Sequence, residues 1–247
     1  MAACLQVEDI GISFGGLKAV QDVSFSLGPG EIMGLIGPNG AGKTTTLNLI
    51  SGLYTCDTGK VILDGVDVTD KKSYERARMG LGRTFQTPRF LSRSTVAENM
   101  KLGTDLADQI GFMKSFLGVK KNDFLDEVDQ YLEIADLTVD WKADISSLSY
   151  GQLKRLEIVR ALLSHPKVLL VDEPAAGLNA KELEKSVALM SYAAKNGVGI
   201  VLIEHKMDMI MNVCDHIVVL NFGKMIAHGT CEEVQSDDAV IEAYLGR

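Results

Sequence analysis

A glycine-rich segment, GPNGAGKTT at residues 37–45, follows directly on the short apolar run EIMGLI. It matches the pattern G-x-x-x-x-G-K-[ST] with Gly37, Gly42, Lys43 and Thr44. Glycine lets the backbone curl so that successive N–H groups face inward and form an anion site at the start of a helix. Lys43 supplies a positive charge for phosphate oxygens, and the Thr44 hydroxyl is placed to bind Mg²⁺. We therefore predict a buried strand, a phosphate-binding loop and a helix, in preference to a glycine-rich turn that binds nothing.

The composition limits the classes of protein to which the chain can belong. Its 247 residues suffice for one large α/β domain or two tightly joined lobes. The formal net charge of -8 argues against a nucleic-acid-binding surface spread over the molecule. The 4 cysteines form no C-x-x-C pair, which favours reduced thiols over zinc or disulfides. Since no apolar run approaches the roughly 18 residues of a membrane span, and the N-terminus does not resemble a signal peptide, work at a membrane would require a partner.

Hydrophobic patterns divide the chain into three parts. Residues 4–36 alternate apolar and polar positions as strands do, residues 43–52 are typical of a helix, and residues 58–68 are typical of a hairpin. A helical period takes over between residues 87 and 164, and strands alternate with helices from residue 167 onward. Such alternation indicates a mainly parallel sheet flanked by helices. We therefore predict an α/β fold with an inserted helical segment.

A second motif, KVLLVDEP at residues 167–174, joins apolar residues to two acids. The apolar residues predict a buried strand that delivers Asp172 and Glu173 at its carboxyl end, where open α/β sheets bind ligands. One acid can hold Mg²⁺ through water while the other orients or deprotonates a hydrolytic water. A solvated acidic turn would explain this motif alone. Together with the phosphate loop, the motif indicates hydrolysis of a nucleoside triphosphate.

A third motif, LSYGQLKRLEIVRALLSHP at residues 148–166, is expected to begin a helix. Ser149 and Gln152 match the S-x-x-Q pattern of a capping box. Gly151 is unexpected inside a first helical turn, because glycine costs about 1 kcal/mol there relative to alanine. We expect it to let a phosphate approach the N–H groups at the positive end of the helix. A chain that cannot bring this second anion site to the same ATP would use it on a partner molecule.

Five motifs in order carry a resemblance to a known family. They are GPNGAGKTT, the glutamine of RTFQTPRF, LSYGQ, VLLVDEP and the histidine of VLIEH. Across essentially the whole chain, this order resembles the nucleotide-binding subunit of ATP-binding cassette (ABC) transporters. The finer pattern, which includes FGGLKAV, LKRLEIVRAL and LIEHKMDMIM, resembles the subfamily that energises bacterial branched-chain amino acid uptake.

The resemblance implies a single ABC ATPase domain of the α/β class over residues 1–247. Its catalytic lobe, residues 1–88 and 165–247, would contain a P-loop NTPase core of the RecA type and an N-terminal antiparallel β subdomain. An inserted α-helical subdomain with the LSYGQ motif would occupy residues 89–164.

The resemblance also implies where ATP and Mg²⁺ bind. Phe14 would stack on adenine, although it could equally be a core residue at a strand end, and Val20 would pack beside the base. The phosphates would be wrapped by consecutive residues: Asn39, Gly40, Ala41, Gly42, Lys43, Thr44 and Thr45. Mg²⁺ would be surrounded by three side chains: Thr44, Gln86 and Asp172.

The remaining roles that the resemblance implies concern catalysis. Gln86 would sense the γ-phosphate, Glu173 would act as general base, and His205 would contact the γ-phosphate. Without this context, His205 would be a solvated residue at a strand end. Three residues of the LSYGQ motif would complete the site of an opposite subunit: Ser149, Gly151 and Gln152. Catalysis would then require a head-to-tail pair of cassettes.

Two positions depart from the family pattern, and one charged run stands out. Tyr150 replaces a glycine of the usual LSGGQ motif, and Asn179 replaces a common aspartate, which puts the coupling between sites in doubt but not hydrolysis. Seven basic residues against one acid lie between residues 71 and 93: Lys71, Lys72, Arg76, Arg78, Arg83, Arg89 and Arg93. We hypothesise that this run faces acidic groups of a membrane subunit or anionic lipid; a solvated face is the alternative.

The function implied is that of an ATPase subunit that powers a bacterial ABC importer through closure of a cassette dimer. Its partners would be a second ABC ATPase subunit, identical or paralogous, two transmembrane permeases and a periplasmic substrate-binding protein, without nucleic acid. It would lie peripherally on the cytoplasmic face of the inner membrane. Branched-chain amino acids are the expected cargo. The alternatives are another cargo such as urea or other amino acids, an exporter, or a soluble ABC ATPase that serves repair or translation.

Overall fold

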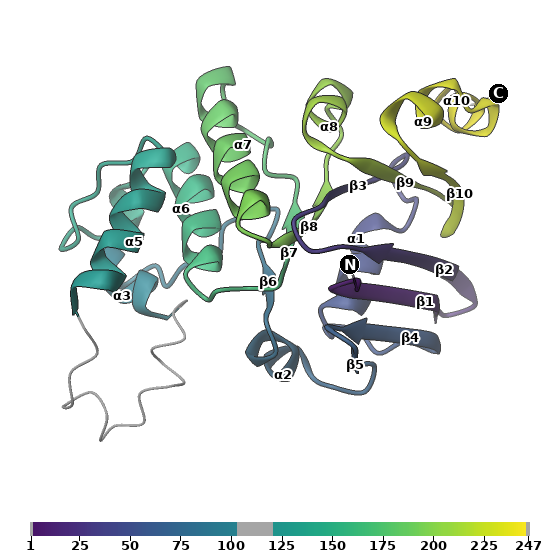
Figure 1. Cartoon of the computed structure of the whole chain (residues 1–247), viewed down its shortest axis with the longest axis horizontal. Coiled ribbons are helices and arrows are strands. Elements are labelled where there is room, and N and C mark those ends of the chain that lie inside the picture. The colour runs from purple at the N-terminus through teal and green to yellow at the C-terminus, as the bar shows by residue number, and fades with distance from the viewer. Residues whose placement is uncertain (1, 103–120, 246–247) are drawn as a thin grey trace.

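The computed structural model describes residues 2–102 and 121–245, and its strands form two sheets (Figure 1). The smaller sheet has the order β2-β1-β4-β5 and antiparallel neighbours. Its strands are β1 (Leu5–Phe14), β2 (Leu17–Leu27), β4 (Thr58–Leu63) and β5 (Val66–Asp67). The expected N-terminal antiparallel sheet and the hairpin at residues 58–68 are therefore both present.

The larger sheet has six strands in the order β10-β9-β3-β8-β7-β6. They are β3 (Ile32–Ile36), β6 (Leu81–Arg83), β7 (Val168–Asp172), β8 (Gly199–Ile203), β9 (His216–Asn221) and β10 (Lys224–Gly229). All neighbours are parallel except β9 and β10, which form an antiparallel hairpin. The prediction of a mainly parallel sheet is confirmed.

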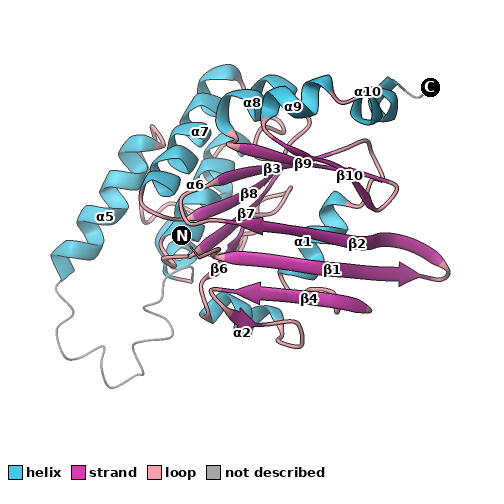
Figure 2. Cartoon of the chain, turned by 45° about the vertical axis from the view of Figure 1, so that its right-hand side comes forward, coloured by secondary structure: helices cyan, strands magenta, loops and turns pink. Residues whose placement is uncertain are grey.

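Helices cover the larger sheet and flank the smaller one. They are α1 (Lys43–Ile50), α2 (Ser73–Arg78), α3 (Val96–Lys101), α5 (Lys121–Ile134), α6 (Tyr150–Leu162), α7 (Ala180–Lys195), α8 (Met207–Val213), α9 (Cys231–Ser236) and α10 (Asp238–Leu245), with the 3₁₀ helix η2 (Ile145–Ser147). Figure 2 shows α7 and α8 on one side of the larger sheet, and the smaller sheet with α1 on the other.

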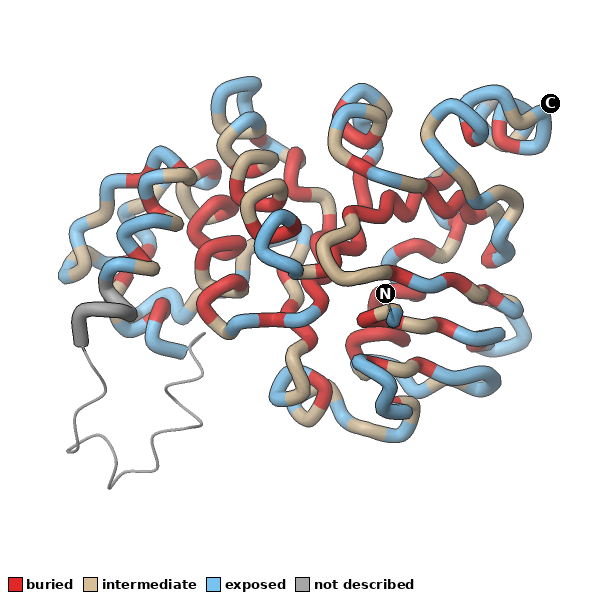
Figure 3. Tube along the Cα trace, in the orientation of Figure 1, coloured by how far each residue is buried: buried red, intermediate tan, exposed pale blue. Residues whose placement is uncertain are grey.

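The hydrophobic core has two parts because the central strands are buried on both faces. Along β7, Leu169 and Val171 pack with the helices of one face. The alternate residues Val168 and Leu170 pack with α1 and the smaller sheet. Period-two alternation of side chains along a strand produces this division, and Figure 3 shows the buried positions concentrated in these strands and on the inner sides of α6 and α7.

The described part of the chain between β6 and β7 contains helices and loops but no named strand. The predicted capping box is present there, because Ser149 accepts a hydrogen bond from the backbone N–H of Gln152, and a second one begins α3, where Thr95 accepts from the N–H of Glu98. The inserted helical segment is therefore confirmed as part of the α/β fold. The lobe boundaries at residues 88/89 and 164/165 stay a prediction, and residues 103–120 of this insertion lie outside the described residues.

The carboxyl ends of four parallel strands, β3, β8, β7 and β6, meet at one edge of the larger sheet. Open α/β sheets bind ligands at this edge. The glycine-rich loop follows β3, Glu173 follows β7 directly, and His205 comes two positions after β8. Within residues 2–102 and 121–245, no helix is both long and apolar enough to cross a membrane.

Candidate nucleotide site

The glycine-rich loop leaves β3 and enters α1 with Lys43 as the first helical residue. The Lys43 side chain is buried and its Nζ donates hydrogen bonds to the carbonyl oxygens of Gly37, at 2.8 Å, and Pro38, at 2.9 Å. Burial lowers the pKa of Lys43, while the nearby carboxylates Glu173 and Asp172 act in the opposite direction. The ammonium group is thus held inside the curl of the loop, beside the acids of β7.

Gly42, the N-cap of α1, explains why the loop needs glycine. Its φ of 101° lies in the left-handed region that favours glycine. A Cβ atom at this position would lie 2.6 Å from the carbonyl oxygen of Ala19, in β2. The loop is also held from the β9–β10 turn, where the Gly223 N–H donates to the Ala41 carbonyl at 3.0 Å. The smaller sheet and the last hairpin thus fix the loop from two sides.

Glu173, directly after β7, is held between two side chains from other elements. Gln86 Nε2 donates to Glu173 Oε2 at 2.7 Å, and His205 Nε2 lies 2.9 Å from Oε1. The φ of Glu173 is 48°, a left-handed value that is uncommon for a residue other than glycine. Such strain is often found at functional sites, where the surrounding structure must hold it. The structure therefore brings together the three predicted catalytic residues.

Asp172, the last residue of β7, lies buried beside Arg83, which the sequence indicated only as part of the basic run. Arg83 Nη2 is 3.7 Å from Asp172 Oδ2, and both side chains are nearly inaccessible to solvent. Burial raises the pKa of Asp172, and Arg83 is the main influence in the opposite direction. Arg83 also donates to the Leu47 carbonyl and the Ser51 hydroxyl of α1. This arginine therefore ties the carboxylate to the helix that follows the phosphate loop.

The three predicted Mg²⁺ ligands share one cavity of about 490 Å³, because Thr44, Gln86 and Asp172 all line it. A hydroxyl, an amide oxygen and one carboxylate are hard oxygen donors, which Mg²⁺ prefers when phosphate and water supply its other ligands. Among the described residues, no cluster of three histidine, cysteine, aspartate or glutamate side chains could hold a metal without such help. The donor set therefore fits a magnesium ion that is shared with phosphates.

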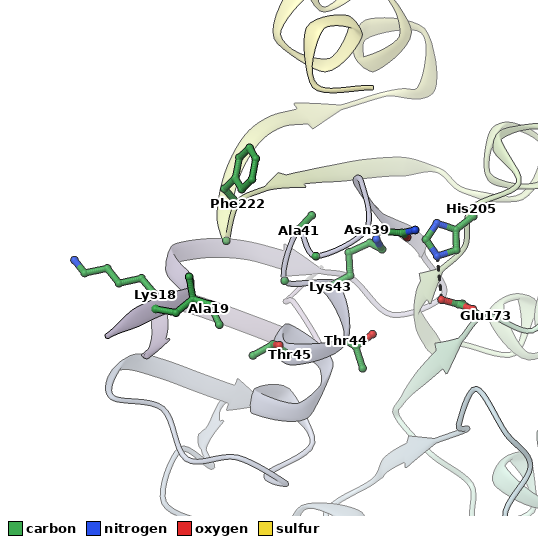
Figure 4. Close-up of a pocket in the computed structure, with 14 residues that line it drawn as sticks. Lys18, Ala19, Asn39, Ala41, Lys43, Thr44, Thr45, Glu173, His205 and Phe222 are labelled. Atoms are coloured by element: carbon green, nitrogen blue, oxygen red, sulfur yellow. Dashed lines mark hydrogen bonds and ion pairs between the residues drawn. The ribbon is translucent and has the colours of Figure 1, made fainter. Parts of the chain in front are cut away.

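A second cavity of about 390 Å³ lies over the phosphate loop (Figure 4). All seven predicted phosphate contacts line it: Asn39, Gly40, Ala41, Gly42, Lys43, Thr44 and Thr45. Figure 4 shows Lys43 and Thr44 in the middle of this site, with Lys18 and Phe222 on one side and Glu173 and His205 on the other. Thr44 lines both cavities, so the phosphate loop and the predicted Mg²⁺ ligands form one continuous site.

The predicted base contacts lie beside this site rather than in its lining. The Phe14 ring is 45% exposed and packs edge-on against Tyr54, with 5.4 Å between ring centroids. Val20 is buried in the core between the sheets. Two exposed apolar residues that sequence reasoning missed, Leu17 and Phe222, line the cavity instead. Both lie in or beside β-hairpin turns, and no sequence pattern indicated that these turns flank the phosphate loop.

The predicted partner-site residues lie at the N-terminus of α6. Among the described residues, the lining of the two cavities includes neither Ser149, nor Gly151, nor Gln152. Gly151 also faces the carboxylate of Glu182, in α7, which a Cβ atom there would displace. The expected approach of a phosphate to this glycine stays a prediction. Arg155 lies 3.7 Å from the same carboxylate and neutralises it.

Glu204, between β8 and His205, is a buried acid that sequence reasoning did not single out. Its carboxylate accepts hydrogen bonds from the N–H groups of Ala175, at 2.6 Å, and His205, at 2.9 Å. It therefore braces the turns that follow β7 and β8, which carry Glu173 and His205. The sequence signal was an acid directly before the histidine of VLIEH, but only the pairing of β7 with β8 shows what it binds.

A phosphate loop lies opposite Glu173, a carboxylate residue with a left-handed backbone, at the edge of a parallel sheet. This arrangement defines a P-loop nucleoside triphosphatase. The model of the family described as "ABC transporter" matches residues 20–176. The chain belongs to the ABC transporter family and is one of its ATP-binding, ATP-hydrolysing cassettes. The family predicted from the motifs is confirmed. A second model, "Branched-chain amino acid ATP-binding cassette transporter", matches residues 224–247.

Curated relatives match nearly the whole chain. A probable branched-chain amino acid transport ATP-binding protein LivG of Archaeoglobus fulgidus is 36% identical over 98% of this chain and 95% of its own length. The high-affinity branched-chain amino acid transport ATP-binding protein LivG of Escherichia coli (strain K12) is 38% identical over 98% of this chain and 97% of its own.

Solved structures show the same fold. A nucleotide-free ATP-binding cassette from an ABC transporter has a TM-score of 0.84 and 33% identity, with full coverage of both chains. The ADP conformation of an ATP-binding cassette of an ABC transporter gives the same values. The P-loop NTPase fold with an inserted helical segment is therefore shown for this chain, and nucleotide binding is a property of its family.

Proposed function

We propose that this chain powers the uptake of branched-chain amino acids as the ATP-hydrolysing subunit of an ABC importer. The observation that carries this proposal is the near full-length identity of 36% and 38% to relatives named for that transport. The match of residues 224–247 to the branched-chain amino acid cassette model supports the same cargo. This segment contains β10 and the two C-terminal helices, and β10 begins directly after Gly223, whose N–H holds the phosphate loop through the Ala41 carbonyl.

In the proposed hydrolysis, Glu173 is the general base and takes a proton from the attacking water. Its carboxylate faces the cavity that Lys43 and Thr44 line, so a water between them and Glu173 would lie near the terminal phosphate. Lys43 binds phosphate oxygens, and His205 contacts the γ-phosphate from the end of β8. Gln86 senses the γ-phosphate from the junction of the two lobes. Removal of the water's proton by a positioned carboxylate contributes about 10²- to 10⁴-fold in rate.

Mg²⁺ would be held by Thr44, Gln86 and Asp172, where it supplies charge neutralisation for the developing phosphate charge. The Asp172 carboxylate lies 3.7 Å from Arg83, which opposes the rise in the pKa of Asp172 that burial causes. Gln86 donates to Glu173 through Nε2, so its amide oxygen is the atom that would bind the metal.

For the base of ATP, Phe14 remains our candidate for stacking on adenine. Its partly exposed ring lies on the β1–β2 hairpin, next to Leu17 of the cavity lining. Val20 would support the base from the core. It lies next to the phosphate loop, because Val20 Cγ2 is 3.6 Å from the position that a Cβ atom on Gly42 would take. Phe222 lies on the opposite side of the phosphate loop from Glu173 and His205 (Figure 4) and offers a second apolar surface.

We further propose that two cassettes, this chain and a paralogue or a second copy, pair head to tail. Ser149, Gly151 and Gln152 lie at the N-terminal end of α6 and, in the described part of the chain, outside the lining of the two cavities of the nucleotide site. This end of a helix favours anions. These residues would complete the ATP site of the opposite cassette, so that binding of ATP closes the pair and hydrolysis opens it.

The membrane partners would be two permeases, with a periplasmic binding protein on the far side and no nucleic acid. The cassette itself would lie peripherally on the cytoplasmic face of the inner membrane. Of the basic run, Arg76 is fully buried and caps α1 through the carbonyls of Leu49 and Ile50, and Arg83 is paired with Asp172. Those two arginine side chains are therefore engaged within the chain and are not our candidates for contacts with a permease or lipid. Arg89 and Arg93 are exposed, three and seven positions after Gln86 in the chain, and remain candidates for permease contacts.

Purification of the tagged chain from its native cell in mild detergent tests this function. We expect two permeases, a second cassette and a periplasmic binding protein to co-purify, and the binding protein to carry leucine, isoleucine or valine. Reconstituted in vesicles, the complex should hydrolyse ATP faster with that loaded binding protein than with the ligand-free one. Recovery of ribosomes or repair factors, or of a binding protein loaded with urea, would overturn the proposed cargo and role.

A further inference from the structure

One face of α6 grips the loop that carries Gln86. Tyr150, Lys154 and Glu157 follow one another at intervals of four and three residues, so they lie on the same side of the helix. All three hydrogen-bond to residues 85–89, which we call the Gln86 loop. The helix that begins with the LSYGQ motif therefore holds the Gln86 loop of its own chain.

Lys154 and Glu157 are buried and serve as fixed anchors. Lys154 Nζ donates to the carbonyl oxygen of Phe85, at 3.3 Å, and to that of Glu173, at 3.1 Å. Glu157 accepts from the N–H groups of Phe85, at 3.4 Å, and Arg89, at 3.1 Å. Both ends of the Gln86 loop are thus attached to α6, and the middle is left to Tyr150.

Tyr150 is partly exposed and contacts two functional loops. Its hydroxyl donates to the carbonyl oxygen of Gln86 at 3.2 Å. Its ring lies over Gly177, in the turn between Glu173 and α7, where a Cβ atom would be 2.9 Å from Tyr150 Cε1. The φ of Gly177 is +75°, so the turn passes close under the ring in a conformation that favours glycine. A side chain that is 42% exposed contributes little to the core, so these contacts are its main structural consequence.

The Gln86 side chain, which this contact supports, is hydrogen-bonded to Glu173. With Gln86 Nε2 at 2.7 Å from Oε2 and His205 Nε2 at 2.9 Å from Oε1, both carboxylate oxygens have a partner. Each oxygen keeps a second lone pair, but a hydrogen bond donated by Gln86 stabilises the carboxylate and makes it a weaker base toward water. Departure of Gln86 would therefore make Glu173 a stronger base.

We propose that the Tyr150 hydroxyl is a latch that keeps Gln86 on Glu173 in the resting cassette. Tyr150 is a positioning residue that acts through Gln86, and this inference rests on the proposed role of Glu173 as base. Because Tyr150 lies between Ser149 and Gly151, a nucleotide of the opposite cassette at those two residues would displace the latch. Arrival of the partner would thereby release Gln86 and free Glu173.

The substitution Tyr150→Phe tests the latch because it removes the hydroxyl and keeps the ring over Gly177. A neutral hydrogen bond changes an equilibrium by about two- to tenfold. We therefore expect kcat for ATP of the full chain to rise about two- to tenfold, with KM and the melting temperature unchanged. Hydrogen exchange at the backbone amides of residues 85–89 should become faster. Tyr192→Phe, near the C-terminal end of α7, removes a hydroxyl from a ring that packs against Tyr131, and it should change neither kcat nor this hydrogen exchange.

A second background separates the latch from a general loosening of the helix. In Gln86→Ala, the carbonyl that accepts from Tyr150 remains but no side chain reaches Glu173, so adding Tyr150→Phe should speed exchange and leave the residual kcat unchanged. Unchanged kcat and unchanged exchange in Tyr150→Phe alone would overturn the latch. An equal rise of kcat in both backgrounds would overturn its action through Gln86. Wild-type turnover in Glu173→Gln would instead show that the proposed base is wrong.

Discussion

Gln86 and Glu173, which are 87 positions apart in the chain, are joined by a hydrogen bond of 2.7 Å from Nε2 to Oε2. Gln86 follows β6 and Glu173 follows β7, and the two strands are parallel neighbours. Because parallel strands end at the same edge, a glutamine and a carboxylate from distant motifs meet there. The relationship joins the segment before the helical insertion to the one after it, so a movement of the inserted helices changes the surroundings of Glu173.

Glu173→Gln should abolish most turnover while ATP still binds. The substitution keeps the shape of the side chain and removes its capacity to take a proton, so we expect kcat to fall at least about 100-fold. Phosphate release and binding of a fluorescent ATP analogue measure the two effects. Glu184→Gln, an exposed position on α7, is the matched control and should retain wild-type turnover. A variant at Glu173 that turns over within twofold of wild type would remove this residue from the role of base.

Asp172→Asn should impair both stability and the response to Mg²⁺. It leaves Arg83, whose side chain is 9% exposed, without its carboxylate partner. An unpaired buried charge costs about 3 kcal/mol in the free energy of unfolding. Urea denaturation measures this loss. In a Mg²⁺ titration of turnover, half-maximal turnover should need a higher Mg²⁺ concentration in the variant than in the wild type. Asp208→Asn, at an exposed position in α8, should change the free energy of unfolding by less than about 0.5 kcal/mol; equal losses in both variants would contradict the pairing.

Gly42→Ala should weaken nucleotide binding as well as the fold. The new methyl group would meet the Ala19 carbonyl at 2.6 Å, and the φ of 101° is unfavourable for alanine, so the loop has to shift. Gly197→Ala is a matched control, because Gly197 also has a positive φ, of 90°, but open space around it. Both variants should lose about 1–3 kcal/mol of stability. Only Gly42→Ala should lose nucleotide affinity, at least tenfold by fluorescence titration, and equal affinity in the two variants would contradict the argument.

Stability should fall at alkaline pH because of buried thiols. Burial raises the pKa of Cys214 to about 12, from 9.0, with Cys231 and Asp215 adding to the shift. In the unfolded chain the thiol ionises near pH 9, while in the folded chain it stays protonated until about pH 12. The contribution of Cys214 to stability is therefore complete below pH 9 and is lost as the pH rises from 9 to 12.

Urea denaturation at pH 8 and pH 10.5 measures this dependence. Cys214→Ala removes the ionisable group, so its free energy of unfolding should decline less between the two pH values than that of the wild type. Cys4, with a pKa raised by burial to about 11, should contribute in the same direction and remain in both proteins. The same decline in wild type and variant would show that the Cys214 thiol does not contribute.

Local patterns predicted the elements because their causes are local. The strand–loop–helix order around Lys43, the helix that begins after Ser149 and the strand before Asp172 depend on turn residues, capping side chains and period-two alternation, all within a few positions of one another. The basic run shows the limit of such patterns. Once the strands are placed, Arg76 is buried, Arg83 is paired with Asp172 and Lys71 is partly exposed, while four of the seven are exposed: Lys72, Arg78, Arg89 and Arg93.

The sequence by itself determined the class of this protein, because the phosphate loop, the acid pair and the capped LSYGQ helix are short motifs whose chemistry lies in adjacent residues. Only the tertiary structure decided which side chains meet. That Glu182 covers Gly151, that Arg83 pairs with Asp172 and that Tyr150 supports Gln86 depends on the strand order and on the packing of α6 against its neighbours. Contacts across such distances are fixed by the burial of whole strands and helices, and no short stretch of sequence contains that information.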